Sequence, residues 1–295
     1  MHEFDLICIG SGPAGQRAAV QASKLGKRVA VVEKQASVGG VCIETGTIPS
    51  KTFREAVRRL YVQDHSESGG SHADPVRPTM ERLMRQVAGV VGRESQVVHD
   101  SLARNDIKMF QGAARFVGPN ELVISGFNGD ETLKAKKFLI GVGTRPAESR
   151  GVTLDGEIAV TSDSLLNLKR LPRSVVVVGA GVIGIEYASM FAALGLKVTV
   201  VDKRPRPLEF LDHEIVDELI HQLRKVDVTF RCGDGLKSLE ITGGDRKQAL
   251  LELESGKFLI AEMVLISTGR VGCTEGLGLE AVSYTHLTLP TKRIV

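Results

Sequence analysis

The sequence predicts an α/β protein with two dinucleotide-binding domains of the Rossmann-like kind. A strand, a glycine-rich turn, a helix, a second strand and a terminal acid follow one another near residue 10. The same five features return near residue 179. The length of 295 residues is enough for roughly two domains, and the 42% hydrophobic and 25% charged content is that of a globular chain.

In the first unit, the apolar run Phe4–Ile9 predicts a buried parallel strand. The turn Gly10–Gly15 follows, a helix is expected over Pro13–Leu25, and a second strand over Val29–Val32. Glu33 stands at the end of that strand, where a carboxylate can accept hydrogen bonds from a ribose diol. This order is typical of the Rossmann fold.

Each glycine of the turn has its own physical reason. Gly10 makes the tight turn, Gly12 lets the backbone approach a pyrophosphate, and Gly15 lets the helix pack closely on the strand. The pyrophosphate is expected at the helix N-terminus, where backbone amides point outward. The predicted ligand-binding residues of this unit are Gly10, Gly12, Pro13, Ala14, Gly15, Glu33 and Lys34.

The second unit repeats the first at a constant offset. Its strand covers Ser174–Val178, and its turn Gly179–Gly184 lies 169 positions after the first turn (179 − 10 = 169). A helix follows, then a strand over Val198–Val201, and Asp202 takes the place of the first acid. The predicted ligand-binding residues here are Gly179, Gly181, Val182, Ile183, Gly184, Asp202, Lys203 and Arg204.

The stretch Gly39–Lys51 contains the most specific motif of the chain. It reads GGVCIETGTIPSK, and Pro49 is expected in the first turn of a helix. It resembles the redox-active segment of the flavoprotein disulfide reductases, whose pattern is GGxCxxxxCxPSK. Cys42 holds the first cysteine position, but Thr47 stands at the second, and a hydroxyl cannot close a disulfide. A threonine before IPSK resembles one branch, the soluble Si-specific pyridine nucleotide transhydrogenases.

The resemblance implies FAD in the first unit and NAD or NADP in the second. The resemblance implies that the second domain is inserted in the first, with an FAD-binding domain at residues 1–148, an NAD(P)-binding domain at 149–270 and a return to the FAD domain at 271–282. Segments around Ala114, Gly143 and Gly269 also match the family. The binding residues added by the resemblance are Gly39, Gly40, Val41, Cys42, Gly46, Thr47, Lys51, Ala114, Gly143, Thr144, Glu186 and Gly269.

The resemblance also implies a hydride relay without a dithiol. NADPH passes a hydride to flavin N5, and NAD takes it from the same flavin face. In the family, the lysine that corresponds to Lys51 lies near flavin N5 and pairs with a glutamate that corresponds to Glu186. A cation there favours the anionic reduced flavin. Cys42 is the third catalytic candidate, either as a thiolate against the ring or as a packed thiol.

The sequence leaves the choice of nicotinamide nucleotide open. Asp202 favours the ribose diol of NAD. Lys203, Arg204 and Arg206 are close enough to meet the 2′-phosphate of NADP. An enzyme that moves hydride between the two nucleotide pools has to accept both.

Supporting elements are expected around the two units. Helices are predicted over 51–64 and about 79–105, with a loop at 66–72 between them, and residues 149–172 are expected to form a linker. Strands are predicted over 107–110, 122–125, 137–142, 228–231, 236–242, 249–253 and 263–267, a hairpin turn at Asn128-Gly129, and a helix over 214–226.

The family pattern stops near Ala281. Residues 283–295 do not fit it and are expected to be a non-native tail on a C-terminally truncated chain, in which His286 has no catalytic role. The interface domain would then be missing, and a homodimer is expected for the full-length protein. The alternatives are another FAD/NAD(P)H oxidoreductase, either a diaphorase or a dihydrolipoamide dehydrogenase-like enzyme, and an inactive nucleotide-binding fragment.

Composition argues against several other classes. The net charge of +3 is too small to indicate nucleic-acid binding. The longest uncharged apolar run, Val175–Ile185, is too short to span a membrane, and the acidic start is unlike a signal peptide, so a cytoplasmic location is expected. The four cysteines show no metal-ligand spacing, and Cys8 is expected to be a core thiol.

Overall fold

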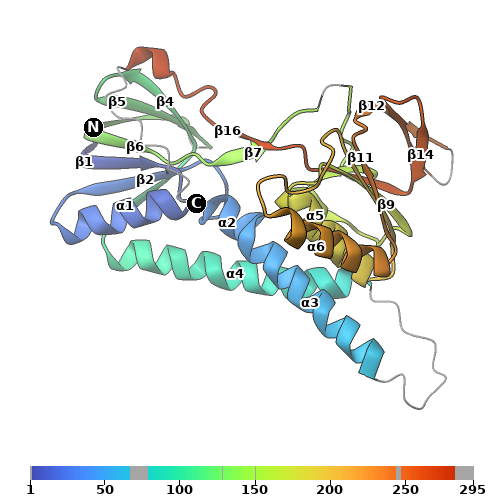
Figure 1. Ribbon diagram of the computed structural model, residues 1–295. Helices are drawn as coiled ribbons and strands as arrows, with labels where there is room; N and C mark the ends of the chain where they lie inside the picture. Colours follow the sequence, from blue (N-terminus) through green and yellow to red (C-terminus); the bar gives the residue numbers. More distant parts are fainter. Residues whose placement is uncertain (1, 67–78, 128, 150, 244–246, 283–295) are drawn as a thin grey trace. The chain divides into compact units, whose positions relative to one another are not determined.

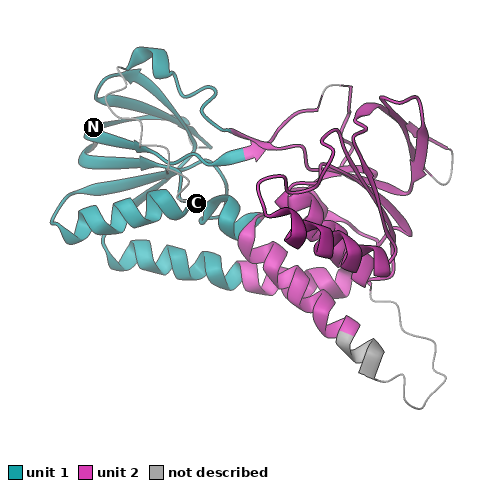
Figure 2. Ribbon diagram, in the orientation of Figure 1, with its two compact units in different colours: residues 1–44, 92–144, 272–295 teal, residues 45–91, 145–271 magenta. Residues whose placement is uncertain are grey.

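The computed structural model describes residues 2–66, 79–127, 129–149, 151–243 and 247–282. Most of the predicted loop at 66–72, Asn128 of the hairpin turn and the predicted tail with His286 lie outside these residues. The chain divides into two compact units. Unit 1 contains residues 1–44, 92–144 and 272–295, and unit 2 contains residues 45–91 and 145–271 (Figure 2). Both units are α/β, as predicted.

Unit 1 is built on a six-stranded mixed sheet in the order β3-β2-β1-β6-β5-β4. Its strands are β1 (His2–Ile9), β2 (Val29–Glu33), β3 (Lys108–Gln111), β4 (Ala113–Gly118), β5 (Glu121–Gly126) and β6 (Gly129–Ile140). Strands β3, β2, β1 and β6 run parallel, and β5 pairs antiparallel with both β6 and β4. Helix α1 (Pro13–Lys24) joins β1 to β2 and lies along one face of the sheet (Figure 1).

The core of unit 1 follows from its apolar strands. All five residues of β2 are buried, and Ile7 and Cys8 of β1 are fully covered. Near the end of the described chain, Leu277 joins the same core, and its carbonyl accepts a hydrogen bond from the amide of Phe116 at 2.8 Å. The short helix η2 (Leu279–Ala281) follows it. Residues 272–282 are therefore part of unit 1.

Unit 2 contains a five-stranded parallel sheet in the order β11-β10-β9-β15-β8 and a three-stranded antiparallel sheet in the order β12-β13-β14. The strands are β8 (Ala159–Thr161), β9 (Ser174–Val178), β10 (Lys197–Asp202), β11 (Val228–Cys232), β12 (Leu236–Thr242), β13 (Gln248–Leu253), β14 (Phe258–Ala261) and β15 (Met263–Ile266). The helices are α5 (Val182–Ala193), α6 (His213–Lys225) and the single turn η1 (Leu165–Asn167). Strands β7 (Thr144–Pro146) and β16 (Arg270–Gly272) form a two-stranded sheet.

Helix α3 (Thr47–Ser66) and the first part of α4 (Met80–Arg104) group with unit 2, whereas the predicted domain limits put them in the first domain. Their apolar faces explain the grouping. Phe53 and Val57 are buried in the same core as α5, and the Phe53 ring centroid lies 6.5 Å from that of Tyr187. The units are defined by packing, so the predicted limits of the nucleotide-binding domains stay a prediction.

The predicted linker at 149–172 is wrong, because it contains a strand of the central sheet. Strand β8 pairs in parallel with β15, with Ala159 opposite Val264, and all three β8 residues are buried. A three-residue strand is too short to show a period in the sequence. Strands β4 and β14 and the short helix α2 (Gly40–Glu44) were also not predicted. None of the described helices is long and apolar enough to cross a membrane.

Candidate dinucleotide-binding sites

The glycine turn of unit 1 is closely packed at its first and third glycines and open at the second. Gly10 has φ +101°, and a Cβ there would lie 2.3 Å from the carbonyl oxygen of Gly141. A Cβ on Gly15 would lie 1.9 Å from the carbonyl oxygen of Gly10, whereas one on Gly12 would meet nothing within 4 Å. This is the division of roles predicted for helix packing and for approach of a pyrophosphate.

Unit 2 repeats these distances. Gly179 has φ +107°, and its Cβ would lie 2.4 Å from the carbonyl oxygen of Ser267. A Cβ on Gly184 would lie 1.9 Å from the carbonyl oxygen of Gly179, and one on Gly181 would again meet nothing within 4 Å. Neither α1 nor α5 has a side-chain cap or an acid in its first turn, so their first-turn amides face outward and suit an anion.

The acid of unit 1 is tied to the glycine turn. Glu33 is 8% exposed, and its Oε2 accepts hydrogen bonds from the amide and the hydroxyl of Ser11 at 2.9 and 2.6 Å. Its Oε1 accepts from the amide of Gln35 at 2.9 Å, and the Glu33 carbonyl accepts from the amide of Gly112 at 2.9 Å. The last bond places the start of the segment with Ala114 next to the acid.

The GGVC segment packs on the same turn. The Gly39 amide donates to Ser11 Oγ at 2.9 Å, and a Cβ on Gly40 would lie 2.9 Å from Cα of Gly12. Helix α2 begins at Gly40 and carries Cys42, whose side chain is half-buried. Unit 1 therefore brings both halves of its predicted site together.

The acid of unit 2 makes the corresponding bonds. Asp202 is 6% exposed, and its Oδ2 accepts from the amide of Ala180 at 2.6 Å. Its Oδ1 accepts from the amide and Nε of Arg204 at 2.8 and 2.9 Å, and Nη2 of Arg204 donates to Oδ2 at 2.5 Å. Burial by itself would raise the pKa of Asp202, but the hydrogen bonds from Arg204 and Ala180 outweigh it, and the pKa is lowered.

The other two cations differ from Arg204. Lys203 is exposed. Arg206 donates from Nη2 to Oδ1 of Asp217 on α6, and its Nε is buried without a partner in the described part of the chain. Only Arg204 of the three therefore contacts the acid that is predicted to bind the ribose.

The predicted partners Lys51 and Glu186 are paired in unit 2. Lys51 Nζ on α3 donates to Glu186 Oε1 on α5, with 58% of the lysine side chain and 18% of the glutamate side chain exposed. Thr47 is exposed at the start of α3, and the Gly46 carbonyl accepts from the Ser50 amide at 3.0 Å. The pairing matches the expectation, while the catalytic roles stay a prediction.

The predicted site residues divide between the two units. Unit 1 holds Gly10, Gly12, Pro13, Ala14, Gly15, Glu33, Lys34, Gly39, Gly40, Val41, Cys42, Ala114, Gly143 and Thr144. Unit 2 holds Gly46, Thr47, Lys51, Gly179, Gly181, Val182, Ile183, Gly184, Glu186, Asp202, Lys203, Arg204 and Gly269.

Cys8 is a core thiol, as predicted. It is 0% exposed, and burial raises its pKa to about 12. Because the thiolate is the nucleophile, we expect Cys8 to resist iodoacetamide in the native protein at mildly alkaline pH, while half-buried Cys42 reacts. Mass spectrometry after timed alkylation measures both sites, and the denatured protein, in which both react, is the control. Faster labelling of Cys8 than of Cys42 would contradict the packing of β1.

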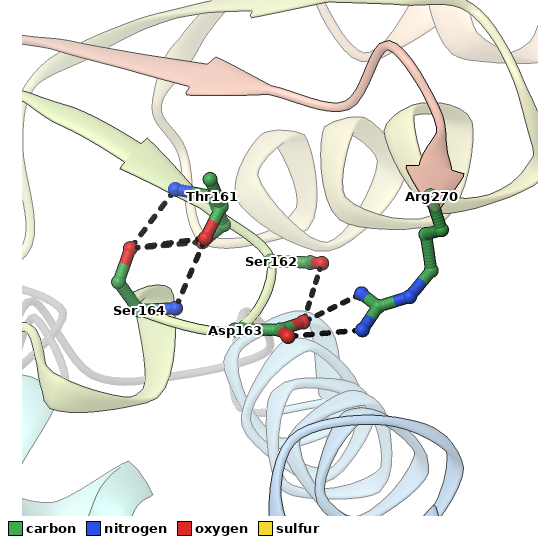
Figure 3. A network of polar contacts seen from close by, with 5 residues as sticks. All are labelled: Thr161, Ser162, Asp163, Ser164 and Arg270. Carbon is green, nitrogen blue, oxygen red and sulfur yellow. Dashed lines mark hydrogen bonds and ion pairs between the residues drawn. The ribbon is translucent and has the colours of Figure 1, made fainter. Parts of the chain in front are cut away.

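The structure adds an ion pair that the sequence interpretation missed. Nη1 and Nη2 of Arg270 donate to Oδ1 and Oδ2 of Asp163 at 2.7 and 3.0 Å, and Ser162 Oγ donates to Oδ1 at 3.1 Å (Figure 3). Asp163 follows β8 and Arg270 follows β15, which are parallel neighbours. Both residues therefore lie at the carboxyl edge of the sheet, where open α/β sheets bind ligands. The sequence signal that could have indicated this pair is the acid Asp163, two residues after the short run Ile158–Thr161.

We expect Asp163→Asn to lower the free energy of unfolding by about 1–3 kcal/mol, because it removes a charged acceptor from a mostly covered guanidinium. Side-chain exposure in the pair is only 21% and 24%. Urea unfolding measures the change. The matched control is Glu148→Gln, which breaks a pair with Arg145 in which the glutamate side chain is 88% exposed. Equal losses in the two variants would contradict a structural role for the Asp163–Arg270 pair.

Comparison with known proteins agrees with this architecture. Residues 4–289 match the family model for pyridine nucleotide-disulphide oxidoreductases, which extends past the predicted limit near Ala281. A soluble pyridine nucleotide transhydrogenase of Mycobacterium tuberculosis (strain ATCC 25177 / H37Ra) is 46% identical over 282 residues, covering 95% of this chain and 60% of that protein. One from Chromohalobacter salexigens is 39% identical, with 96% and 60% covered. The chain thus spans about 60% of the length of these relatives.

Solved structures show the same fold. The Cu(II) complex of the HOCl-induced flavoprotein disulfide reductase RclA from Escherichia coli superposes with a TM-score of 0.82 at 28% identity, over 96% of this chain and 60% of that one. LpdA from Mycobacterium tuberculosis gives a TM-score of 0.85 at 24% identity and supports the fold alone. Family membership implies one site for FAD and one for NAD(P), and the two repeated units are the candidates for these sites. The chain belongs to the pyridine nucleotide-disulphide oxidoreductase family.

Proposed function

We propose that the chain is the FAD- and NAD(P)-binding part of a pyridine nucleotide transhydrogenase, which moves hydride from NADPH to NAD. The observation that carries the proposal is that both units contain the same kind of candidate nucleotide-binding site. Each unit keeps a glycine turn with open space at the second glycine and a buried acid bonded to that turn. Thr47 in place of a second cysteine removes the disulfide that would pass electrons to another substrate. The mycobacterial relative at 46% identity bears the transhydrogenase name.

The residues of unit 1 fit the adenosine and pyrophosphate of FAD. The start of α1 offers outward amides to the pyrophosphate, and Gly12 leaves room for the close approach. Within the described residues, Oε1 of Glu33 receives a single donor, so it can still accept a hydrogen bond from a ribose hydroxyl. When bound, FAD supplies the capacity to accept a hydride from one nicotinamide nucleotide and give it to another.

Unit 2 would hold the nicotinamide nucleotide by the same means. The start of α5 faces the pyrophosphate, and Asp202 and Arg204 meet the adenosine ribose and its 2′-phosphate. Lys51 is proposed as the cation nearest the reacting flavin nitrogen, and Glu186 as the residue that holds the lysine in place. The homodimer and the cytoplasmic location stay predictions.

A steady-state assay with NADPH as donor and thio-NAD as acceptor tests the proposal. We expect FAD-loaded protein to form thio-NADH and to reduce quinones and lipoamide much more slowly. Rapid quinone reduction without thio-NADH formation would favour a diaphorase. Lipoamide reduction would favour a dihydrolipoamide dehydrogenase-like enzyme. Protein that stays colourless after incubation with FAD would make the chain a nucleotide-binding fragment without the activity.

A further inference from the structure

Every acceptor position of Asp202 is occupied by the protein itself. Its two oxygens receive four donors, three of them from Arg204 and one from the amide of Ala180. A carboxylate offers about four acceptor positions in total. The hydroxyls of an adenosine ribose therefore find no free position on Asp202 while the guanidinium stays in place.

Glu33 provides a comparison inside the same chain. In the described residues it receives three donors, two from Ser11 and one from the amide of Gln35, so Oε1 keeps room for a ribose hydroxyl. The repeat offset places Arg204 at the position of Gln35 (204 − 35 = 169). Both residues donate their backbone amide to the acid, but only the arginine also covers it with its side chain. The guanidinium is therefore an addition specific to unit 2.

The guanidinium can leave Asp202 without a change in the backbone. The Arg204 amide is held by Asp202, and the Arg204 carbonyl accepts from the amide of Gly233 at 2.8 Å. The arginine side chain is 38% exposed, whereas the aspartate side chain is 5% exposed. In the described part of the chain, Asp202 is the one hydrogen-bond partner of the guanidinium. The movable member of the pair is the arginine.

We propose that Arg204 guards Asp202 and that either nicotinamide nucleotide has to displace it in order to bind. This inference rests on the proposed function of unit 2 as the NAD(P) site. With NADP, the displaced guanidinium gains the 2′-phosphate as a new bidentate partner. With NAD, the ribose diol takes the vacated positions on Asp202, and the guanidinium turns to solvent. The displaced guanidinium finds a new partner when NADP binds and none when NAD binds. Arg204 therefore favours the binding of NADP while still allowing NAD to bind.

If Arg204 covers Asp202, its removal should weaken the binding of one nucleotide and strengthen the binding of the other, which simple charge attraction does not predict. Arg204→Gln copies Gln35 and uncovers the acid. We expect the affinity for 2′,5′-ADP to fall by about tenfold to a hundredfold, the worth of one charge-assisted contact. We expect the affinity for 5′-ADP to rise by about two- to fivefold, because a part-exposed ion pair no longer has to be broken. Isothermal titration of the full chain with each probe measures both, and neither probe needs a flavin.

Two variants control the experiment. Lys197→Gln removes one positive charge from an exposed residue at the opposite end of β10 from Asp202, and should leave both affinities within about twofold of the wild type. Arg204→Lys keeps the charge but loses the bidentate fork. It should retain most of the 2′,5′-ADP affinity and raise the 5′-ADP affinity in part. This conservative variant also serves if the glutamine variant is unstable.

The outcomes separate the inference from the function beneath it. Tighter 5′-ADP binding together with weaker 2′,5′-ADP binding in Arg204→Gln supports the guard. Unchanged or weaker 5′-ADP binding overturns it, because Arg204 would then only bind the phosphate or attract the negatively charged ligand. Wild-type protein that binds neither probe overturns the proposed NAD(P) site, and the guard with it.

Discussion

Gly184→Ala is expected to disrupt unit 2 and to abolish nucleotide binding there. The added Cβ would lie 1.9 Å from the carbonyl oxygen of Gly179 and 2.7 Å from Oγ of Ser267. The first of these atoms is backbone and cannot rotate away, so α5 would have to move off the glycine turn. We expect the free energy of unfolding to fall by on the order of 3 kcal/mol or more, the range of severe overpacking. Urea or thermal unfolding measures the loss.

Gly181→Ala is the matched control for that substitution. Gly181 has φ −80° and ψ −175°, which any residue adopts, and a Cβ there would meet nothing within 4 Å. Stability should change by no more than about 0.5 kcal/mol. Affinity for NADPH should still fall, because the methyl group would fill the space that is proposed for the pyrophosphate. Equal destabilisation by the two alanines, or full NADPH affinity in Gly181→Ala, would contradict the separate roles of these glycines.

Lys51→Ala is expected to slow hydride transfer from NADPH to bound FAD by roughly a hundredfold, the usual effect of removing one electrostatic group from a reacting centre. The reason is the loss of the cation that is proposed to lie beside the flavin nitrogen that receives the hydride. Stability should fall by no more than about 1 kcal/mol, because the lysine side chain is 58% exposed and water screens its pair with Glu186. Rapid-mixing absorbance of the FAD-loaded protein measures the rate, and thermal unfolding measures the stability.

Glu186→Gln separates the two members of the pair. It keeps the lysine and a hydrogen-bonding partner, and removes one negative charge. We expect a smaller loss of rate than in Lys51→Ala, since the proposed role of Glu186 is to position Lys51. Arg58→Ala, which removes an exposed cation from the same helix, should leave the rate unchanged. An unchanged rate in Lys51→Ala would remove this lysine from the mechanism.

The parts of the site that could be predicted from the sequence depend on local spacing. Gly10 and Gly15 are close in the chain, and a Cβ on the second would clash with the first, so the motif alone specifies the turn. Glu33 and Asp202 stand at the ends of β2 and β10, which pair with β1 and β9, the strands that lead into the two glycine turns. The constant offset between the two units identifies both acids from the sequence. The Lys51–Glu186 pair was predicted from family resemblance, because residues 135 positions apart show no local signal.

The parts that could not be predicted depend on pairing between distant segments or on side-chain placement. Strand β8 has three residues and is defined by its partner β15, about a hundred positions later in the chain, so Asp163 was hidden in an expected linker. Its ion pair with Arg270 needs both strands in place. The sequence put Arg204 near Asp202, but whether its guanidinium would face the acid or solvent depends on the rotamer. That contact is the basis of the proposed guard.

A single-turnover experiment tests the proposed hydride transfer between nucleotides most directly. FAD-loaded protein is mixed without oxygen with one equivalent of NADPH, and thio-NAD is added once the flavin absorbance has fallen. We expect the flavin absorbance to return as thio-NADH forms in equal amount. The number of thiols that react with a thiol reagent should stay the same at every stage, because no disulfide opens or closes. Flavin that NADPH does not reduce, or that thio-NAD does not reoxidise while a quinone does, would contradict the transhydrogenase proposal.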